Sequence, residues 1–151
     1  MAFPLPEPMR AALDEAAAAC LAEEVPVGAV ITRGGMIVTA GQNRTRRGID
    51  PTAHAEIEAL RAAARALGTE RLDECDLWVT LEPCAMCAGA IALARIRRLY
   101  FAAPDPKGGA VLHGPRFFTQ PTCHHRPEIY PGFGEEEAAG MLRDFFRDRR
   151  G

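Results

Sequence analysis

Two short motifs with metal-ligating residues constrain this chain more than any other feature of its sequence. They are His54-Ala55-Glu56 and Pro83-Cys84-Ala85-Met86-Cys87. The two cysteines lie three residues apart at the predicted start of a helix, where free N–H groups and the helix dipole favour the thiolate, the form that binds metals. His54 likewise opens a predicted helix. A fold in which these helix starts meet would offer one metal ion three ligands.

The ligand types indicate zinc, with about one ion for the chain. Two thiolates and one imidazole, His54 with Cys84 and Cys87, leave the fourth position to water, which is typical of catalytic sites. Zinc bound to two thiolates is a weaker Lewis acid than zinc bound to three histidines, so a nearby carboxylate is needed to take the proton of the water. Glu56 is the candidate for this acid/base role. By itself, the cysteine pair would also suit a redox pair or half of a structural site.

The composition predicts one globular domain over residues 1–151. Hydrophobic residues make up 48% of the 151 residues and charged residues 25%, which argues against disorder. No stretch approaches the roughly 18 apolar residues of a membrane span, and the first residues lack the features of a secretion signal. We therefore expect a soluble, cytoplasmic protein without a membrane partner. Five cysteines, an odd number, argue against a disulfide framework.

The net charge of −2 excludes a globally basic nucleic-acid-binding protein but permits local basic surfaces. Basic residues gather at 44–47, at 95–107 with Lys107, and in the tail from Arg143 to Arg150. Each cluster alone is more simply explained as a solvated surface.

The order of predicted elements indicates an α/β layered domain with a mixed sheet and helices on its faces. Gly34-Gly35 predicts a hairpin turn, and Gly68 lies where a helix should end. Residues 104–127 read as a long, mostly irregular segment. Helices are expected at 9–23, 53–67, 84–94 and 135–149, and strands at 27–32, 36–41, 76–81 and 98–103.

These motifs, together with longer matching stretches, resemble the bacterial tRNA-specific adenosine deaminases of the cytidine deaminase-like superfamily. The pattern His-x-Glu followed by Pro-Cys-x-x-Cys is the signature of zinc-dependent nucleobase deaminases. The resemblance covers nearly the whole chain: Glu24 to Val30, Asn43-Arg44, Asp50 to Ile57, Thr80 to Ala90, Ala94 to Ile96, Asp105 to Ala110, His125 to Glu128 and Phe145 to Arg150.

The resemblance implies a three-layer α/β/α cytidine deaminase-like domain with a mixed five-stranded sheet. It also implies a homodimer that hydrolytically converts adenosine to inosine at the wobble position of a tRNA anticodon. By position in the motifs, Asn43 would bind the flipped purine, Val27 and Ala55 would line the pocket, and Asp105 would lie near the ribose. Lys107, Arg149 and Arg150 would contact phosphates, and one of Phe145 and Phe146 would stack on a loop base.

Three alternatives remain open from the sequence. A guanine deaminase, or another free-base or nucleoside deaminase, would use the same zinc chemistry but would lack the 105–109 loop and the arginine-bearing Phe-Phe tail. A non-catalytic zinc-bearing RNA-binding module would have no use for Glu56. Finally, a second metal site could form from a separate cluster of residues: His113, Cys123, His124 and His125.

Overall fold

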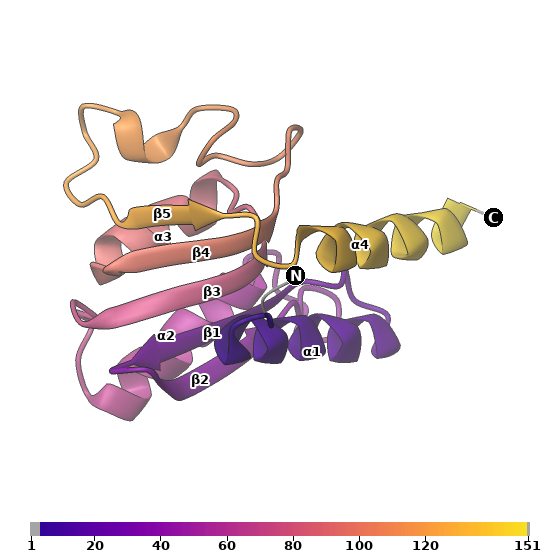
Figure 1. The fold of residues 1–151 in the computed structure, drawn as a ribbon, viewed down its shortest axis with the longest axis horizontal. Coiled ribbons are helices and arrows are strands. Elements are labelled where there is room, and N and C mark those ends of the chain that lie inside the picture. Colours follow the sequence, from indigo (N-terminus) through magenta and orange to yellow (C-terminus); the bar gives the residue numbers. More distant parts are fainter. Residues whose placement is uncertain (1–3, 151) are drawn as a thin grey trace.

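A single five-stranded sheet organises the chain, of which the computed structural model describes residues 4–150 without the side chain of Arg150 (Figure 1). Its order is β2-β1-β3-β4-β5. Strand β1 is antiparallel to both of its neighbours, β2 and β3, whereas β3, β4 and β5 run parallel to one another. The strands are β1 (Gly28–Arg33), β2 (Met36–Gln42), β3 (Cys75–Leu81), β4 (Arg98–Ala103) and β5 (Glu128–Pro131). The predicted mixed, five-stranded sheet is confirmed.

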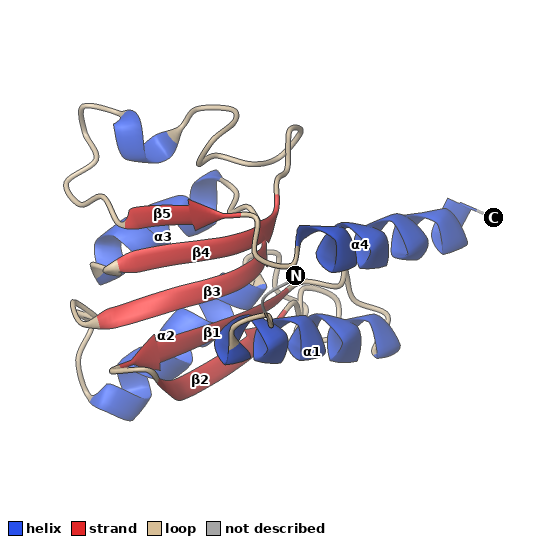
Figure 2. Ribbon diagram, viewed as in Figure 1, coloured by secondary structure: helices blue, strands red, loops and turns tan. Residues whose placement is uncertain are grey.

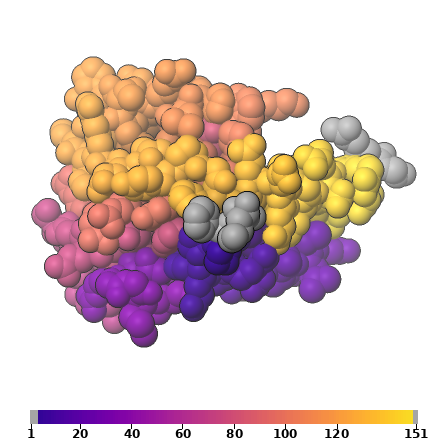
Figure 3. Space-filling model, viewed as in Figure 1, coloured from indigo at the N-terminus to yellow at the C-terminus, as the bar shows by residue number. Residues whose placement is uncertain are grey.

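Helices cover both faces of the sheet, which confirms the three-layer architecture (Figure 2). The four helices are α1 (Glu7–Leu21), α2 (Ala55–Leu67), α3 (Ala85–Ala94) and α4 (Glu135–Arg150). Alternation along β3 shows the layering, because Leu77 and Val79 pack in the core beneath α2 and α3 while Trp78 packs against Met9 of α1. On the face seen in Figure 3, α1 and α4 lie side by side. No helix in the described range is long and apolar enough to cross a membrane.

Two glycines let helices approach the sheet closely. A Cβ atom on Gly28 would lie 2.0 Å from the carbonyl oxygen of Ala12 in α1, and one on Gly41 would lie 2.7 Å from that of Ala55 in α2. Any side chain at these positions would push the helices away. Since Ala55 is the first residue of α2, Gly41 holds the start of that helix against the sheet.

The observed elements correct the sequence prediction in three places. Strand β5 was not predicted as an element, and it is an edge strand of four residues that ends in Pro131. Helices α2 and α3 begin after His54 and Cys84, which are N-cap residues with extended backbone rather than helical residues. Helix α1 begins at Glu7, two residues before the predicted start, because prolines are well tolerated in a first helical turn.

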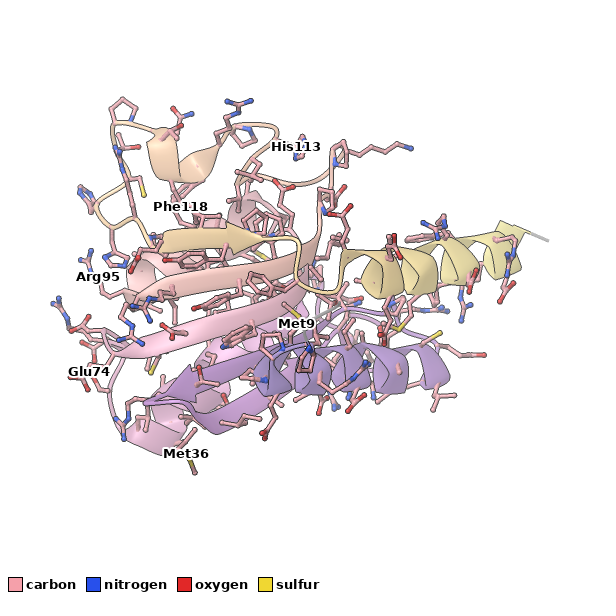
Figure 4. The ribbon with its side chains drawn as sticks, viewed as in Figure 1. Met9, Met36, Glu74, Arg95, His113 and Phe118 are labelled. Atoms are coloured by element: carbon pink, nitrogen blue, oxygen red, sulfur yellow. The ribbon has the colours of Figure 1, made fainter. Side chains whose placement is uncertain are left out.

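The long segment between β4 and β5 is irregular, as predicted, but it is anchored to the core. Its one regular element is a short 3₁₀ helix, η1 (Phe117–Thr119). Phe118 is buried in the core beside α3, and the N–H of Phe117 donates to the carbonyl of Ala110. Figure 4 shows Phe118 and His113 on this segment, above the sheet. The segment is therefore held at several points along its length.

Candidate metal centre and active site

The ends of two strands and the starts of two helices bring the predicted metal ligands together. His54 is the N-cap of α2, Cys84 is the N-cap of α3, and Cys87 lies in the first turn of α3. The Nδ1 atom of His54 is 3.6 Å from the Sγ atom of Cys84 and 3.5 Å from that of Cys87. The two motifs, which lie about 30 residues apart in the chain, thus bring their three ligand atoms together as predicted.

These distances fit a zinc ion. Tetrahedral zinc with Zn–S bonds of about 2.3 Å and Zn–N bonds of about 2.0–2.1 Å separates sulfur from nitrogen by about 3.6 Å. The three ligand atoms lie within 4.8 Å of one another, and within residues 4–150 no other group of three or more potential ligands is so arranged. Both the donor types and their spacing match the metal expected from the sequence.

The alternative second metal site is not formed in the described structure. The Sγ of Cys123 donates to the carbonyl of His125, and Nε2 of His125 lies 2.6 Å from the carbonyl of Ile96. His113 pairs instead with the carboxylate of Glu82. These side chains are occupied by ordinary structural hydrogen bonds.

Hydrogen bonding within the cluster sets the protonation of the two cysteines. The bond from Cys87, followed by the bond with His54, lowers the pKa of the Cys84 thiol to about 4. The same contact with Cys84 raises the pKa of Cys87. Hydrogen bonding to Cys84 also raises the pKa of His54. Cys84 is therefore a thiolate at neutral pH, which is the form that binds metal.

Glu56 lies in the first turn of α2 and is only 4% exposed. Burial is the main cause that raises the pKa of its carboxyl group to about 7. A carboxyl group with such a pKa can both take up and release a proton at neutral pH. Burial at this site thus gives Glu56 the property that an acid/base residue needs.

A pocket of about 280 Å³ is lined by Glu56 and by two of the three metal ligands, His54 and Cys84. Of the residues predicted to bind substrate, Val27, Asn43, Ala55 and Asp105 line it, whereas Lys107 does not. Val27 precedes β1 instead of lying on it. The full lining consists of Val25, Val27, Asn43, Thr45, His54, Ala55, Glu56, Leu81, Glu82, Cys84, Asp105 and Gly108. The pocket has room for about one nucleoside, so a longer substrate would have to lie mostly outside it.

Two buried carboxylates hold the loops that frame this pocket, and the sequence analysis assigned a role to neither. Glu24 is fully buried and accepts hydrogen bonds from the backbone N–H groups of Arg46 and Arg47 in the loop after β2. Glu82, 2% exposed, accepts hydrogen bonds from the segment that follows β4. Glu24 stands before an apolar stretch and Glu82 after one, and both lie in stretches that resemble the family, but neither signal predicts the hydrogen bonds that they make.

The known proteins to which this chain is similar are deaminases, as the site predicts. The family model of MafB19-like deaminases matches residues 6–150. The tRNA-specific adenosine deaminase of Agrobacterium fabrum is 58% identical over 142 residues, which cover 94% of this chain and 93% of that protein. This chain belongs to the tRNA-specific adenosine deaminase family.

Two solved deaminase structures resemble this chain closely in fold but differ in how similar their sequences are to it. A structure from a study of deaminases that edit adenosine to inosine at the wobble position of transfer RNA has a TM-score of 0.88 and 57% identity, covering 89% of this chain and 98% of its own. The guanine deaminase of Nitrosomonas europaea has a TM-score of 0.81 but only 26% identity, over 96% of this chain and 85% of its own. The fold is shared with both, whereas the sequence is far more similar to the wobble-position deaminase.

The tail that the sequence analysis associated with this family lies on α4. Phe145 is buried, whereas Phe146 is 47% exposed. The guanidinium of Arg149 lies 3.7 Å from the centre of the Phe145 ring. None of these three residues lines the pocket, and the side chain of Arg150 lies outside the described structure. Of the two phenylalanines, Phe146 is thus the one that is available to a partner.

Proposed function

We propose that this protein is a zinc-dependent hydrolase that converts adenosine to inosine at the wobble position of a tRNA anticodon. One observation carries the proposal: His54, Cys84 and Cys87 meet beside the buried Glu56 at a nucleoside-sized pocket. Identity of 58% to a tRNA-specific adenosine deaminase supports adenosine in tRNA as the substrate. We assign one zinc ion to each subunit, held by these three ligands.

Glu56 carries the protons in this proposal. Zinc, when bound, lowers the pKa of a water molecule so that it can attack at neutral pH. The Glu56 carboxylate takes a proton from the attacking water and gives it to a nitrogen of the purine ring. The carboxylate next takes the second proton from the hydroxyl group that now stands on the purine carbon and gives it to the amino group, which leaves as ammonia. Adenosine and water are thus converted to inosine and ammonia, and Glu56 ends in its starting state.

The pocket wall recognises the reacting nucleoside. A deaminase must take its base out of the stack, and a loop nucleotide costs least to unstack. We propose that Asn43 hydrogen-bonds the purine, while Val27 and Ala55 pack against it. Asp105, which also lines the pocket, accepts a hydrogen bond from the ribose 2′-hydroxyl.

The remaining contacts of the anticodon loop lie outside the pocket. Lys107 is exposed on the loop that begins at Asp105. We assign to Lys107, Arg149 and Arg150 contacts with phosphates, and to Phe146 a stacking contact with a loop base. A substrate that extends beyond the pocket is consistent with the small volume of the pocket itself.

We also propose that the chain, as one deaminase domain over residues 1–151, acts as a homodimer in the cytoplasm, where tRNA is found. Support for the dimer comes from the outer surface of α3, where Leu93 is 79% exposed and Met86 38%. A groove of about 490 Å³ runs beside Leu93 between α2 and α3. Ala88 and Ala92, on the same helix, belong to the buried core and are not part of the proposed interface.

A substrate panel tests the proposal. Purified protein is incubated with an anticodon stem-loop RNA, adenosine, guanine and cytidine, and inosine, xanthine and uridine are measured. We expect inosine from the RNA at rates far above those of the free compounds. Xanthine from guanine with no inosine from RNA would favour a guanine deaminase, the alternative that shares this fold at 26% identity.

A further inference from the structure

Glu82 is a buried carboxylate that the proposed chemistry does not use. It follows the last residue of β3, lines the pocket, and is 2% exposed. Among the described residues no lysine or arginine pairs with it, and its one side-chain partner is His113, whose Nδ1 lies 2.8 Å from Oε1. A buried charge is costly unless hydrogen bonds compensate it. Most of the hydrogen bonds that compensate the buried charge of Glu82 come from backbone N–H groups of one loop, residues 105–113.

The two oxygens of Glu82 have different partners. Oε2 accepts hydrogen bonds from three consecutive backbone N–H groups at 3.1, 2.9 and 3.2 Å, those of Val111, Leu112 and His113. Successive N–H groups of this kind form a concave site for an anion. Oε1 accepts the N–H of Asp105 at 3.0 Å. The Glu82 carboxylate therefore joins the start of the loop, at Asp105, to residues 111–113 later in the same loop.

Gly109 packs directly against this junction. A Cβ atom on Gly109 would lie 2.5 Å from Oε2 of Glu82 and 2.5 Å from the carbonyl oxygen of Asp105, which accepts the Gly109 N–H at 2.8 Å. The loop backbone thus fits the carboxylate with no room for one more carbon atom. Displacement of the Glu82 carboxylate would therefore move the loop backbone at Gly109, and displacement of that backbone would move the carboxylate.

The side chain of Asp105 is fixed by the same loop. Its Oδ1 accepts the N–H groups of Lys107 and Gly108 at 3.2 and 3.0 Å, and Asp105 lines the same pocket as His54 and Cys84. A continuous set of hydrogen bonds therefore runs from Glu82 through the backbone of Asp105 to its carboxylate.

We infer that Glu82 is a positioning residue for substrate recognition. Through the Asp105 N–H it sets where the Asp105 carboxylate meets the ribose of the reacting nucleoside, and so contributes to the preference for a ribonucleotide over a deoxyribonucleotide. This inference rests on the proposed function, which places the ribose at Asp105.

The test compares two anticodon stem-loop RNAs that carry adenosine or 2′-deoxyadenosine at the reacting position. The variants are Glu82→Gln, Asp105→Asn and their combination. Glu128→Gln is the control, because Glu128 is an exposed carboxylate of β5 that pairs with Arg98 of β4. The ratio of kcat/KM for the two RNAs is measured, together with zinc content. A merely structural defect would lower both rates and leave their ratio unchanged.

Wild-type protein should favour the ribonucleotide by about 10- to 100-fold, the value of one hydrogen bond to a charged group. Glu82→Gln places an NH₂ group against either the Asp105 N–H or the three consecutive N–H groups, so the ratio should fall toward 1 with zinc retained. Asp105→Asn should lower it equally, and the combined variant should lower it no further. Glu128→Gln should retain the wild-type ratio.

Gly109→Ala provides an independent variant that removes no charge and no hydrogen-bonding group. The added methyl group must displace Asp105 or Glu82, so this variant should also lower the ratio, and it decides the question if Glu82→Gln does not fold. An unchanged ratio in the folded Glu82→Gln protein, or in Gly109→Ala, would overturn the inference alone. No inosine from either RNA with the wild-type protein would instead overturn the proposed function.

Discussion

His54 and Cys84 occupy helix N-cap positions in which neither makes a side-chain hydrogen bond to its helix. Serine, aspartate or asparagine at such positions would contribute about 1 kcal/mol through capping. The two side chains point toward each other instead. The helices therefore lack the stabilisation of a side-chain cap, and both side chains can bind the same metal ion. Such a conflict between local preference and observed residue is typical of functional sites.

Glu56→Gln separates proton transfer from metal binding. Glu56 is proposed to move protons without binding the metal, so the variant should keep its zinc and lose activity by about 10²–10⁴-fold or more. Cys84→Ser provides the contrast, since it removes a ligand and supplies a good N-cap. It should lose zinc and activity but fold normally. Zinc content by elemental analysis and inosine formation are measured for both, and loss of zinc from Glu56→Gln would make Glu56 a ligand.

Ile49 is strained and exposed at once. Its φ angle is 48°, a left-handed conformation that is costly for a β-branched residue, and its side chain is 92% exposed. Ile49→Asn should therefore raise the free energy of unfolding by about 1 kcal/mol, since asparagine tolerates this conformation. Thermal unfolding measures the change. Ile49→Val, which keeps the β-branch, should leave the stability unchanged, and an equal gain from valine would contradict the explanation by strain.

At the scale of elements, each of the two pocket loops is tied to a buried carboxylate at a strand end. Glu24 precedes β1 and holds residues 46 and 47, whereas Glu82 follows β3 and holds residues 105–113. Loops of this kind are usually mobile, because few of their backbone groups bond within the protein. Here the carboxylates supply acceptors to the loops, which gives the pocket a preformed rim.

The Glu24 contact makes stability depend on pH. Burial alone would raise the pKa of Glu24, but hydrogen bonds from Arg47 and Arg46 outweigh it and lower that pKa below its usual 4.5. The unfolded chain therefore binds a proton more readily than the folded chain, and this contribution to stability is present above about pH 5 and lost as the pH falls below 4.5.

Glu24→Gln should accordingly destabilise the protein by about 1–3 kcal/mol at pH 7, and by progressively less as the pH falls below 4.5. Urea unfolding of both proteins at a series of pH values measures the difference. A difference that stays constant with pH would show that the ionised form of Glu24 is not what holds the loop. Glu136→Gln, at an exposed position in the first turn of α4, is the control.

At the scale of the whole molecule, the proposed function requires the pocket and the basic tail to act on one substrate. The pocket accommodates about one nucleoside, whereas Lys107 and the end of α4 are exposed beyond it. A net charge of −2 gives no general attraction to RNA, so binding has to depend on a few local cations.

A salt series tests this arrangement. In single-stranded regions, log affinity changes with log salt with a slope of about −0.7 for each neutralised phosphate. Lys107→Ala, and Arg149→Ala with Arg150→Ala, should each weaken tRNA binding and flatten this slope, with zinc content unchanged. Arg71→Ala removes an exposed arginine that pairs with Asp73, and it should retain the wild-type slope. Unchanged slopes in both test variants would exclude the loop and tail from RNA binding.

Local patterns in the sequence were sufficient for most of the fold and for the choice of metal ligands. The Gly34-Gly35 turn and Gly68 mark the ends of elements through interactions within a few residues, and the predicted helices and strands lie within two residues of the observed bounds. The three ligand types and Glu56 were chosen from chemistry that depends on residue identity. The roles assigned to these residues remain predictions, which the variants above test.

Only the tertiary structure decided which distant groups meet. Strand β5 has four residues, no clear alternation and a terminal proline, so it becomes a strand only through pairing with β4. Glu24 and Glu82 look like ordinary acids in the sequence, because their hydrogen-bond partners lie more than 20 residues away. Residue identity determines what a side chain can do chemically, whereas burial and the convergence of remote backbone groups determine which of those capacities the folded protein uses.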